Sequence, residues 1–269
     1  MKKRTTLLVV AAGAGYASDV ARRALRRGLV NDVIYADETP ESFDAAMRTV
    51  NPNDNLIIAK GMCETAPFMR LVIGYDDKAL IKGGADGFLS HCFIVEKRRF
   101  PFFWLKKRVI ITDAAVNIAP TKEQKVKIIA HAADLARRAL GIRRPTVSIL
   151  TASGRMNPKI LSSVDGGWLI DNGNVANADL RLDQLDTAIS PRARRLKKLA
   201  GEAAHIILAH DLDSGNSLFK AYVLCGGFSA AGLVMGGAVP VVLNSRSDGA
   251  RSKLLSIKYA KKLLDENNR

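Results

Sequence analysis

The residues best suited to chemistry follow a short apolar run near the C-terminus. Ser245, Arg246 and Asp248 place a hydroxyl, a guanidinium and a carboxylate within four residues, separated only by Asn244 from apolar residues 241–243. In open α/β sheets, ligands bind outside the carboxyl ends of the strands. The pattern therefore indicates a ligand site at a strand end, with ordinary loop capping as the alternative.

Two further segments place polar residues beside apolar runs. Ser90 and His91 lead into apolar residues 92–94, and Asn216 and Lys220 lie in a segment, 211–220, that predicts a strand end, a Gly-Asn turn and a helix start. Backbone N–H groups at a helix start commonly hold phosphate, and the lysine could assist them. Ordinary capping remains an alternative for each segment.

Other motifs give weaker signals. Gly13 and Gly15 follow the first apolar run as in a dinucleotide-binding fingerprint, but Ser18 stands where the third glycine belongs, and only Asp37 could bind a ribose. A tight turn between strand and helix is therefore favoured. The four histidines and three cysteines show neither metal-ligand spacing nor a disulfide framework, so we expect no metal site.

The elements that must position these residues alternate along the chain. Short apolar runs alternate with helical patterns, and this alternation predicts an α/β fold with mostly parallel sheets flanked by helices. The predicted strands are residues 7–12, 32–36, 55–59, 92–96, 109–112, 146–151, 204–209, 232–235 and 239–244. The clearest helix is Lys122–Leu140, because Thr121 and Gln124 can form a capping box before it and Gly141 suits its C-cap.

The remaining segments set limits on class and location. Residues 157–178 are predicted to be irregular, and the basic stretch 192–198 reads as a solvated helix face. Residues 1–17 imitate a signal peptide, but a buried strand followed by a helix over 19–27 is favoured. No apolar stretch approaches the roughly 18 residues of a membrane span. With scattered cysteines, the chain reads as a soluble cytoplasmic protein without a membrane partner.

The net charge and the aromatic content indicate which class of binding partner to expect. The net charge is +15, which indicates an anionic partner. Aromatic residues make up only 6% of the chain, and they form no stripe between basic residues, so nucleic acid is not the expected partner.

Taken together, several motifs in order resemble the phosphate acetyl/butyryltransferase family, and the butyryl branch more than the acetyl branch. The resemblance runs from about residue 55 to the C-terminus and is dense after residue 109. The motifs are Lys60-Gly61, Ser90-His91, residues 112–120 with Asn117, Asn157-Pro158-Lys159, residues 185–190, Ser214-Gly215-Asn216 with Lys220, and Ser245-Arg246-Ser247-Asp248.

This resemblance implies a two-lobed α/β protein of the isocitrate/isopropylmalate dehydrogenase-like fold. One lobe would comprise residues 1–112 and 239–269, the other residues 113–238, with the active-site cleft between them. The family transfers an acyl group between coenzyme A, which is a substrate, and inorganic phosphate, without a metal or other cofactor. A homodimer or higher homo-oligomer is also implied, and the apolar spacing of residues 254–264 is consistent with association.

The resemblance also assigns roles. Arg246 would bind the phosphate group, Ser245 would donate to a tetrahedral oxyanion, and Asp248 would act as the general base for the thiol. The substrate-binding residues would be Lys60, Ser90, His91, Asn117, Asn216 and Lys220.

The chain departs from the family pattern in several places. The family's arginine before Ser-His is absent from residues 86–89, and Arg251 and Ser252 stand where an acidic residue is common. Residues 181–186 and 153–155 also differ from the usual motifs. A family member that binds coenzyme A or acyl phosphate without efficient turnover is therefore the alternative interpretation.

Overall fold

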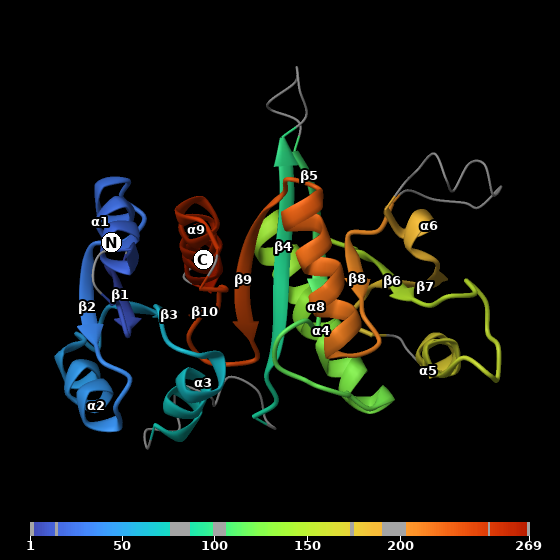
Figure 1. The fold of residues 1–269 in the computed structure, drawn as a ribbon, viewed down its shortest axis with the longest axis horizontal. Coiled ribbons are helices and arrows are strands. Elements are labelled where there is room, and N and C mark those ends of the chain that lie inside the picture. The colour runs from blue at the N-terminus through green and yellow to red at the C-terminus, as the bar shows by residue number, and fades with distance from the viewer. Residues whose placement is uncertain are drawn as a thin grey trace. The chain divides into compact units, whose positions relative to one another are not determined.

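The computed structural model describes residues 3–13, 16–75, 87–98, 106–172, 175–189, 203–246 and 248–267. The chain forms two compact units (Figure 1): unit 1 comprises Met1–Leu89 and Ala230–Arg269, and unit 2 comprises Ser90–Ser229. The predicted lobes assign residues 90–112 and 230–238 differently from these units. Each unit is described below by itself.

The strands of unit 1 are mostly parallel, in the order β2, β1, β3, β10, β9. β1 pairs in parallel with β2 and β3, β3 pairs in parallel with β10, and β9 runs antiparallel to β10. All six side chains of β1 are buried, as expected of a strand covered on both faces. The bounds are β1 Thr5–Val10, β2 Asp32–Ala36, β3 Asn55–Lys60, β9 Ser229–Met235 and β10 Val241–Val242.

Helices cover both faces of this sheet. In Figure 1, α1 (Tyr16–Arg26) and α9 (Ala250–Asn267) lie on one side, and α2 (Pro40–Thr49) and α3 (Thr65–Gly74) on the other. This two-sided arrangement is typical of βαβ units, whose helices cover the sheet that their strands form. α9 packs against α1, β3 and β10, and the apolar residues it buries are Leu254, Ile257, Ala260, Leu263 and Leu264.

The strands of unit 2 follow the order β4, β5, β8, β6, β7. β4 and β5 are antiparallel, and the other pairs are parallel. The strand bounds are β4 Ser90–Arg98, β5 Lys106–Thr112, β6 Thr146–Leu150, β7 Asp179–Asp183 and β8 Ile206–Leu208. The helices are α4 Lys122–Leu140, α5 Leu161–Asn172, α6 Leu185–Ile189 and α8 Leu212–Lys220, and α8 continues as a π-helical turn, η2 Ala221–Cys225.

The structure confirms the predicted α/β class and the longest helix. α4 has the predicted bounds, and Thr121 and Gln124 make both hydrogen bonds of the capping box. Gly141 ends the helix with φ 75°, a left-handed conformation that glycine adopts without strain. Each predicted strand contains a strand of the structure or overlaps one, although β10 is much shorter than residues 239–244.

Residues 157–178 were predicted to be irregular, and this prediction was wrong. α5 occupies residues 161–172, and β7, which follows it, was not predicted. Gly166 in this segment serves close packing: a Cβ at this position would lie 2.3 Å from Leu182 Cδ2 and 3.0 Å from Ile149 Cγ2. Glycine at this position therefore lets α5 approach β6 and β7, and it does not interrupt the helix.

Two other predictions have different outcomes. Gly215 and Asn216 lie inside α8, which begins at Leu212, so the predicted turn at these residues was wrong. The basic stretch 192–198 lies outside the described residues. Within the described ranges, no helix combines the length and the apolar character needed to cross a membrane.

Candidate functional site

Lys60, the last residue of β3, has a buried side chain that holds the following loop. Its Nζ donates a hydrogen bond of 2.8 Å to the carbonyl oxygen of Cys63. The loop also lies against the end of β1, because Gly61 N and Met62 N donate to the carbonyls of Val10 and Ala11 at 2.8 and 2.7 Å. These contacts fix the backbone of residues 60–63.

Gly61 is required by this close approach. A Cβ at this position would lie 2.2 Å from the carbonyl oxygen of Ala11 and 2.6 Å from that of Val10, and backbone atoms cannot move aside as a side chain can. In the Lys60-Gly61 pair, the lysine therefore stabilises the loop by a hydrogen bond, and the glycine allows the loop to approach the end of β1.

A second loop of unit 1, after β10, is organised by Asp248. The Oδ2 atom of this buried carboxylate accepts hydrogen bonds of 3.0 Å from Ser245 N and from Asn244 Nδ2. Asn244 Oδ1 in turn accepts from Ser256 Oγ of α9 at 2.7 Å. The turn is therefore tied to α9, and its two outermost residues, Ser245 and Arg246, are exposed.

The two loops meet through Arg246. Its Nη2 lies 3.1 Å from Glu64 Oε1, in an exposed ion pair between the β3–α3 loop and the turn after β10. Unit 1 thus brings the candidate residues Lys60, Arg246 and Asp248 into one neighbourhood. Ser247 lies outside the described residues. Glu64 was not among the candidates from the sequence.

Two buried lysines, Lys60 and Lys253, lie close enough to Asp248 for its charge to affect their pKa values. Burial lowers the pKa of Lys60, and the nearby charge of Arg246 lowers it further, while Cys63, Asp248 and Glu64 oppose the shift. Burial also lowers the pKa of Lys253 on α9, with Lys60 adding to the shift and Asp248 opposing it. Both lysines and Asn244 line a cavity of about 20 Å³. Lys253 is thus a further charged group at this site, which the sequence did not reveal.

A larger hollow of unit 1, about 840 Å³, lies between α2 and α3 and is lined by Phe43, Arg48, Arg70 and Tyr75, among others. None of the candidate residues from the sequence lines it. The candidate residues from the sequence therefore lie outside this hollow.

In unit 2, Asp113 organises the loop after β5. Oδ1 of this buried carboxylate accepts hydrogen bonds of 3.0 Å from Ala115 N and Val116 N. Oδ2 accepts from His91 N at 2.9 Å and from Asn117 Nδ2 at 2.6 Å. A single carboxylate thus shapes the loop and positions the amide of Asn117.

The first turns of α8 pack closely on this loop. A Cβ on Gly215 would lie 2.3 Å from the carbonyl oxygen of Asp113, so only glycine permits the approach. Asn216 Nδ2 donates to the carbonyl of Ala114 at 3.1 Å. Lys220, at the last position of α8, has an exposed side chain. Asn117 and Asn216 are therefore both tied to the Asp113 loop.

Ser90 and His91, at the start of β4, are fully buried. Ser90 Oγ lies 2.9 Å from His131 Nδ1, within hydrogen-bonding distance. The ring of His91 meets Phe93 edge to face, at 4.3 Å between ring centroids. Both side chains face the interior of unit 2.

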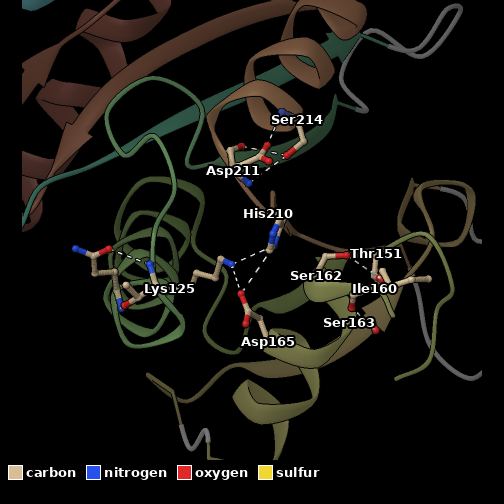
Figure 2. A network of polar contacts seen from close by, with 11 residues as sticks. Lys125, Thr151, Ile160, Ser162, Ser163, Asp165, His210, Asp211 and Ser214 are labelled. Atoms are coloured by element: carbon tan, nitrogen blue, oxygen red, sulfur yellow. Dashed lines mark hydrogen bonds and ion pairs between the residues drawn. The ribbon is translucent and has the colours of Figure 1, made fainter. Parts of the chain in front are cut away.

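A partly buried polar network lies at the start of α8 (Figure 2). Lys125 Nζ of α4 lies 2.6 Å from Asp165 Oδ2 of α5 and 3.1 Å from His210 Nδ1. Since a lysine ammonium only donates hydrogen bonds, His210 Nδ1 must accept, and the proton of the neutral ring is on Nε2. Burial and Lys125 lower the pKa of His210, opposed by Asp165 and Asp211.

Asp211, the next residue, caps α8. Its side chain accepts from Ser214 N at 2.8 Å, and Ser214 Oγ lies 3.2 Å from Asp211 N, so the two residues form a capping box. The hydrogen bonds from Ser214 lower the pKa of Asp211. Among the described residues, no group of three or more His, Cys, Asp or Glu could hold a metal ion.

Comparison with known proteins identifies similar chains. Residues 78–260 match the family model described as phosphate acetyl/butaryl transferase. This match includes every candidate residue except Lys60. The phosphate acetyltransferase of Rickettsia typhi is 30% identical over 231 residues, which cover 83% of this chain and 64% of that protein. The chain thus spans less than two thirds of this relative.

Two solved structures are similar in fold to this protein over nearly its whole chain. A branched-chain phosphotransacylase from Enterococcus faecalis V583 has a TM-score of 0.77 and 26% identity, covering 96% of this chain and 99% of that one. A beta-decarboxylating dehydrogenase from Thermococcus kodakarensis has a TM-score of 0.55 and 12% identity, covering 98% and 84%. The second likeness concerns the fold alone, and it confirms the predicted dehydrogenase-like architecture.

Proposed function

Because this chain belongs to the phosphate acetyl/butaryl transferase family, we propose that it transfers an acetyl or butyryl group between coenzyme A and inorganic phosphate. The observation that carries this proposal is the turn of residues 244–248. There a buried carboxylate fixes the backbone and leaves the Arg246 guanidinium exposed for an anion. A guanidinium suits phosphate because its planar fork can donate two parallel hydrogen bonds.

In the proposed reaction, a phosphate oxygen attacks the thioester carbonyl, the carbonyl oxygen becomes an oxyanion, and the thiolate of coenzyme A leaves. Arg246 binds the phosphate, and the Ser245 hydroxyl donates to the oxyanion, where a fixed donor stabilises developing charge. In the reverse direction, the thiol, which has a pKa of about 8.5 in water, must lose its proton to attack. Asp248 is the proposed base.

The other candidate residues would bind substrate. Lys60 adds positive charge beside Arg246, which favours phosphate over neutral ligands. In unit 2, Asn117, Asn216 and Lys220 are the proposed contacts to the acyl phosphate. Ser90 and His91 are the remaining proposed substrate-binding residues, and His91 N also donates to Asp113, whose carboxylate positions the Asn117 amide.

The test measures release of coenzyme A from a panel of acyl-CoAs, with and without phosphate. We expect release only with phosphate, and the panel identifies the preferred acyl chain. Arg246→Lys should raise the KM for phosphate, because an ammonium cannot reproduce the bidentate contact. Full activity of Arg246→Ala with unchanged dependence on phosphate would contradict the assignment of Arg246.

We also propose a homo-oligomer in the cytoplasm. The cytoplasmic location is supported by three free cysteines, one of them exposed, which suit a reducing compartment. Association is supported by exposed apolar side chains on and beside α5, namely Met156, Leu161, Val164 and Ile170.

A further inference from the structure

Glu64 stands at the N-cap of α3 but does not cap it. Its backbone is extended, with φ −72° and ψ 156°, and its side chain makes no capping hydrogen bond. Residues preferred at this position, such as serine or aspartate, accept from the first N–H groups of the helix. The Glu64 carboxylate instead accepts from Arg246 Nη2 at 3.1 Å.

The backbone is held on both sides of this ion pair. Before Glu64, Gly61 and Met62 are hydrogen-bonded to the end of β1, and Lys60 Nζ donates to the carbonyl of Cys63. Beside Arg246, Ser245 N donates to the carboxylate of Asp248. Two fixed loops thus bring together side chains that are 182 positions apart in the sequence.

The charged ends of the pair are nevertheless open to solvent. The side chains are 54% exposed for Arg246 and 69% exposed for Glu64. Exposed pairs of this kind contribute little stability, because water competes for both charges. A phosphate group can offer two oxygens to the guanidinium, so it can replace a partner that uses one nitrogen.

We propose that the Glu64 carboxylate competes with phosphate and acyl phosphate for the Arg246 guanidinium. Glu64 is paired with Arg246 until the anion displaces it, and this competition sets the affinity of the site for the anion. This inference rests on the proposed function, in which Arg246 binds phosphate. The negative charge of Glu64 also opposes a second anion nearby. Glu64 therefore favours ligands that bind the guanidinium more strongly than a single carboxylate does.

Glu64→Gln tests the proposal, because it keeps the length of the side chain and removes its charge. Calorimetric titration of the protein with inorganic phosphate should give a Kd about two- to fivefold lower than that of the wild type, the range expected when an exposed ion pair no longer competes. Glu41→Gln is the matched control. It makes the same change of charge in the exposed first turn of α2, and it should leave the Kd unchanged.

Glu64→Ser provides a second variant with a separate readout. Serine removes the carboxylate and restores a side chain that can cap α3. We expect the same gain in phosphate affinity together with a melting temperature at or above that of the wild type. Agreement of the two variants would exclude an effect peculiar to the glutamine side chain.

Arg246→Ala, alone and combined with Glu64→Gln, separates this inference from the proposed function. If the gain depends on Arg246, the Glu64 change should have no effect in the Arg246→Ala background. A gain that persists there, or weaker binding in Glu64→Gln, would overturn the competitor role. Release of coenzyme A by the wild type with an unchanged Kd in Glu64→Gln would overturn the inference alone. An Arg246→Ala protein that binds phosphate normally would overturn both.

Discussion

Asp248 is the single residue whose role most affects the proposed chemistry. Its Oδ2 atom accepts from Ser245 N and Asn244 Nδ2, so it shapes the turn that presents Arg246. A base and a turn-forming carboxylate respond differently to loss of charge. Asparagine keeps an oxygen that accepts hydrogen bonds, but it cannot take up a proton at neutral pH.

Asp248→Asn should therefore lower kcat by about 10²–10⁴-fold while the turn remains formed. The KM for coenzyme A should change little, because the carboxylate would act on the thiol proton and not on the phosphates. Steady-state kinetics in the direction that consumes coenzyme A measure both values, and circular dichroism verifies the fold. Turnover close to that of the wild type would leave Asp248 with the turn-forming role alone.

At this scale, residue spacing identified candidates that are neighbours in the chain, and the family resemblance added Lys60, which is distant from Arg246 in the sequence. Ser245, Arg246 and Asp248 were recognisable because they lie within four residues of one another, shortly after the apolar run 241–243. Glu64 was not recognisable, since its partner Arg246 is 182 positions away. Asp113 was found only as part of the motif of residues 112–120. Its role as a hydrogen-bond acceptor was not recognisable, because one of its donors, His91 N, lies 22 positions before it.

At the scale of elements, the packing of α8 depends on the close approach of Gly215 to the loop that contains Asp113. Gly215→Ala would place a methyl group 2.3 Å from the carbonyl oxygen of Asp113, a backbone atom. Although alanine favours helix by about 1 kcal/mol over glycine, overpacking typically costs about 1–3 kcal/mol. We expect a lower melting temperature and a raised KM for acyl phosphate.

Gly74→Ala in α3 is the control for this prediction. A Cβ there meets no atom within 4 Å, so the added methyl group should be neutral or stabilising. Equal melting temperatures for the two variants would show that α8 does not need the close approach.

The network of α4, α5 and the β8–α8 loop should respond to pH through His210 (Figure 2). The groups that face this ring are Lys125, Asp165 and Asp211. The folded-state pKa is lowered from 6.5, chiefly by burial, so the unfolded chain binds the proton more readily. The contribution of neutral His210 to stability is therefore present above about pH 6.5 and is lost as the pH falls towards the folded-state pKa.

His210→Asn should remove this part of the pH dependence, because an asparagine oxygen can accept from Lys125 without titrating. Urea unfolding at pH 8 and at pH 5.5 measures the effect. The wild type should lose more stability than the variant between these pH values. Equal losses would show that His210 does not contribute.

Elements whose signals are local could be predicted, and elements fixed by distant packing could not. The capping box and the C-terminal glycine of α4 lie within or beside the helix, so its bounds were predicted correctly. α5 contains the pair Gly166-Gly167, which reads as irregular until β6 and β7 are placed against Gly166. The same reason explains the error at Gly215, where the partner lies on a loop about 100 positions earlier.

For the molecule as a whole, we predict self-association. Most of the apolar residues of the C-terminal helix, which the sequence suggested for this purpose, are buried in unit 1, and Leu255 is half-buried. Leu161 and Ile170 of α5 are 65% and 40% exposed and are better candidates for a contact between copies. Light scattering at micromolar concentration should give a mass well above 29.1 kDa. Leu161→Lys should return it towards that value, and a monomeric wild type would refute the prediction.

The two-residue strand β10 has a consequence for how the protein is made. It lies between β3 and β9, so the sheet of unit 1 is completed only by residues that follow the whole of unit 2. On the ribosome, the N-terminal strands must wait with the edge of β3 uncovered, while the continuous unit 2 can fold as soon as it emerges. An unpaired strand edge is a site of mispairing, so the emergence of β9 and β10 ends the period in which the edge of β3 is open to other chains.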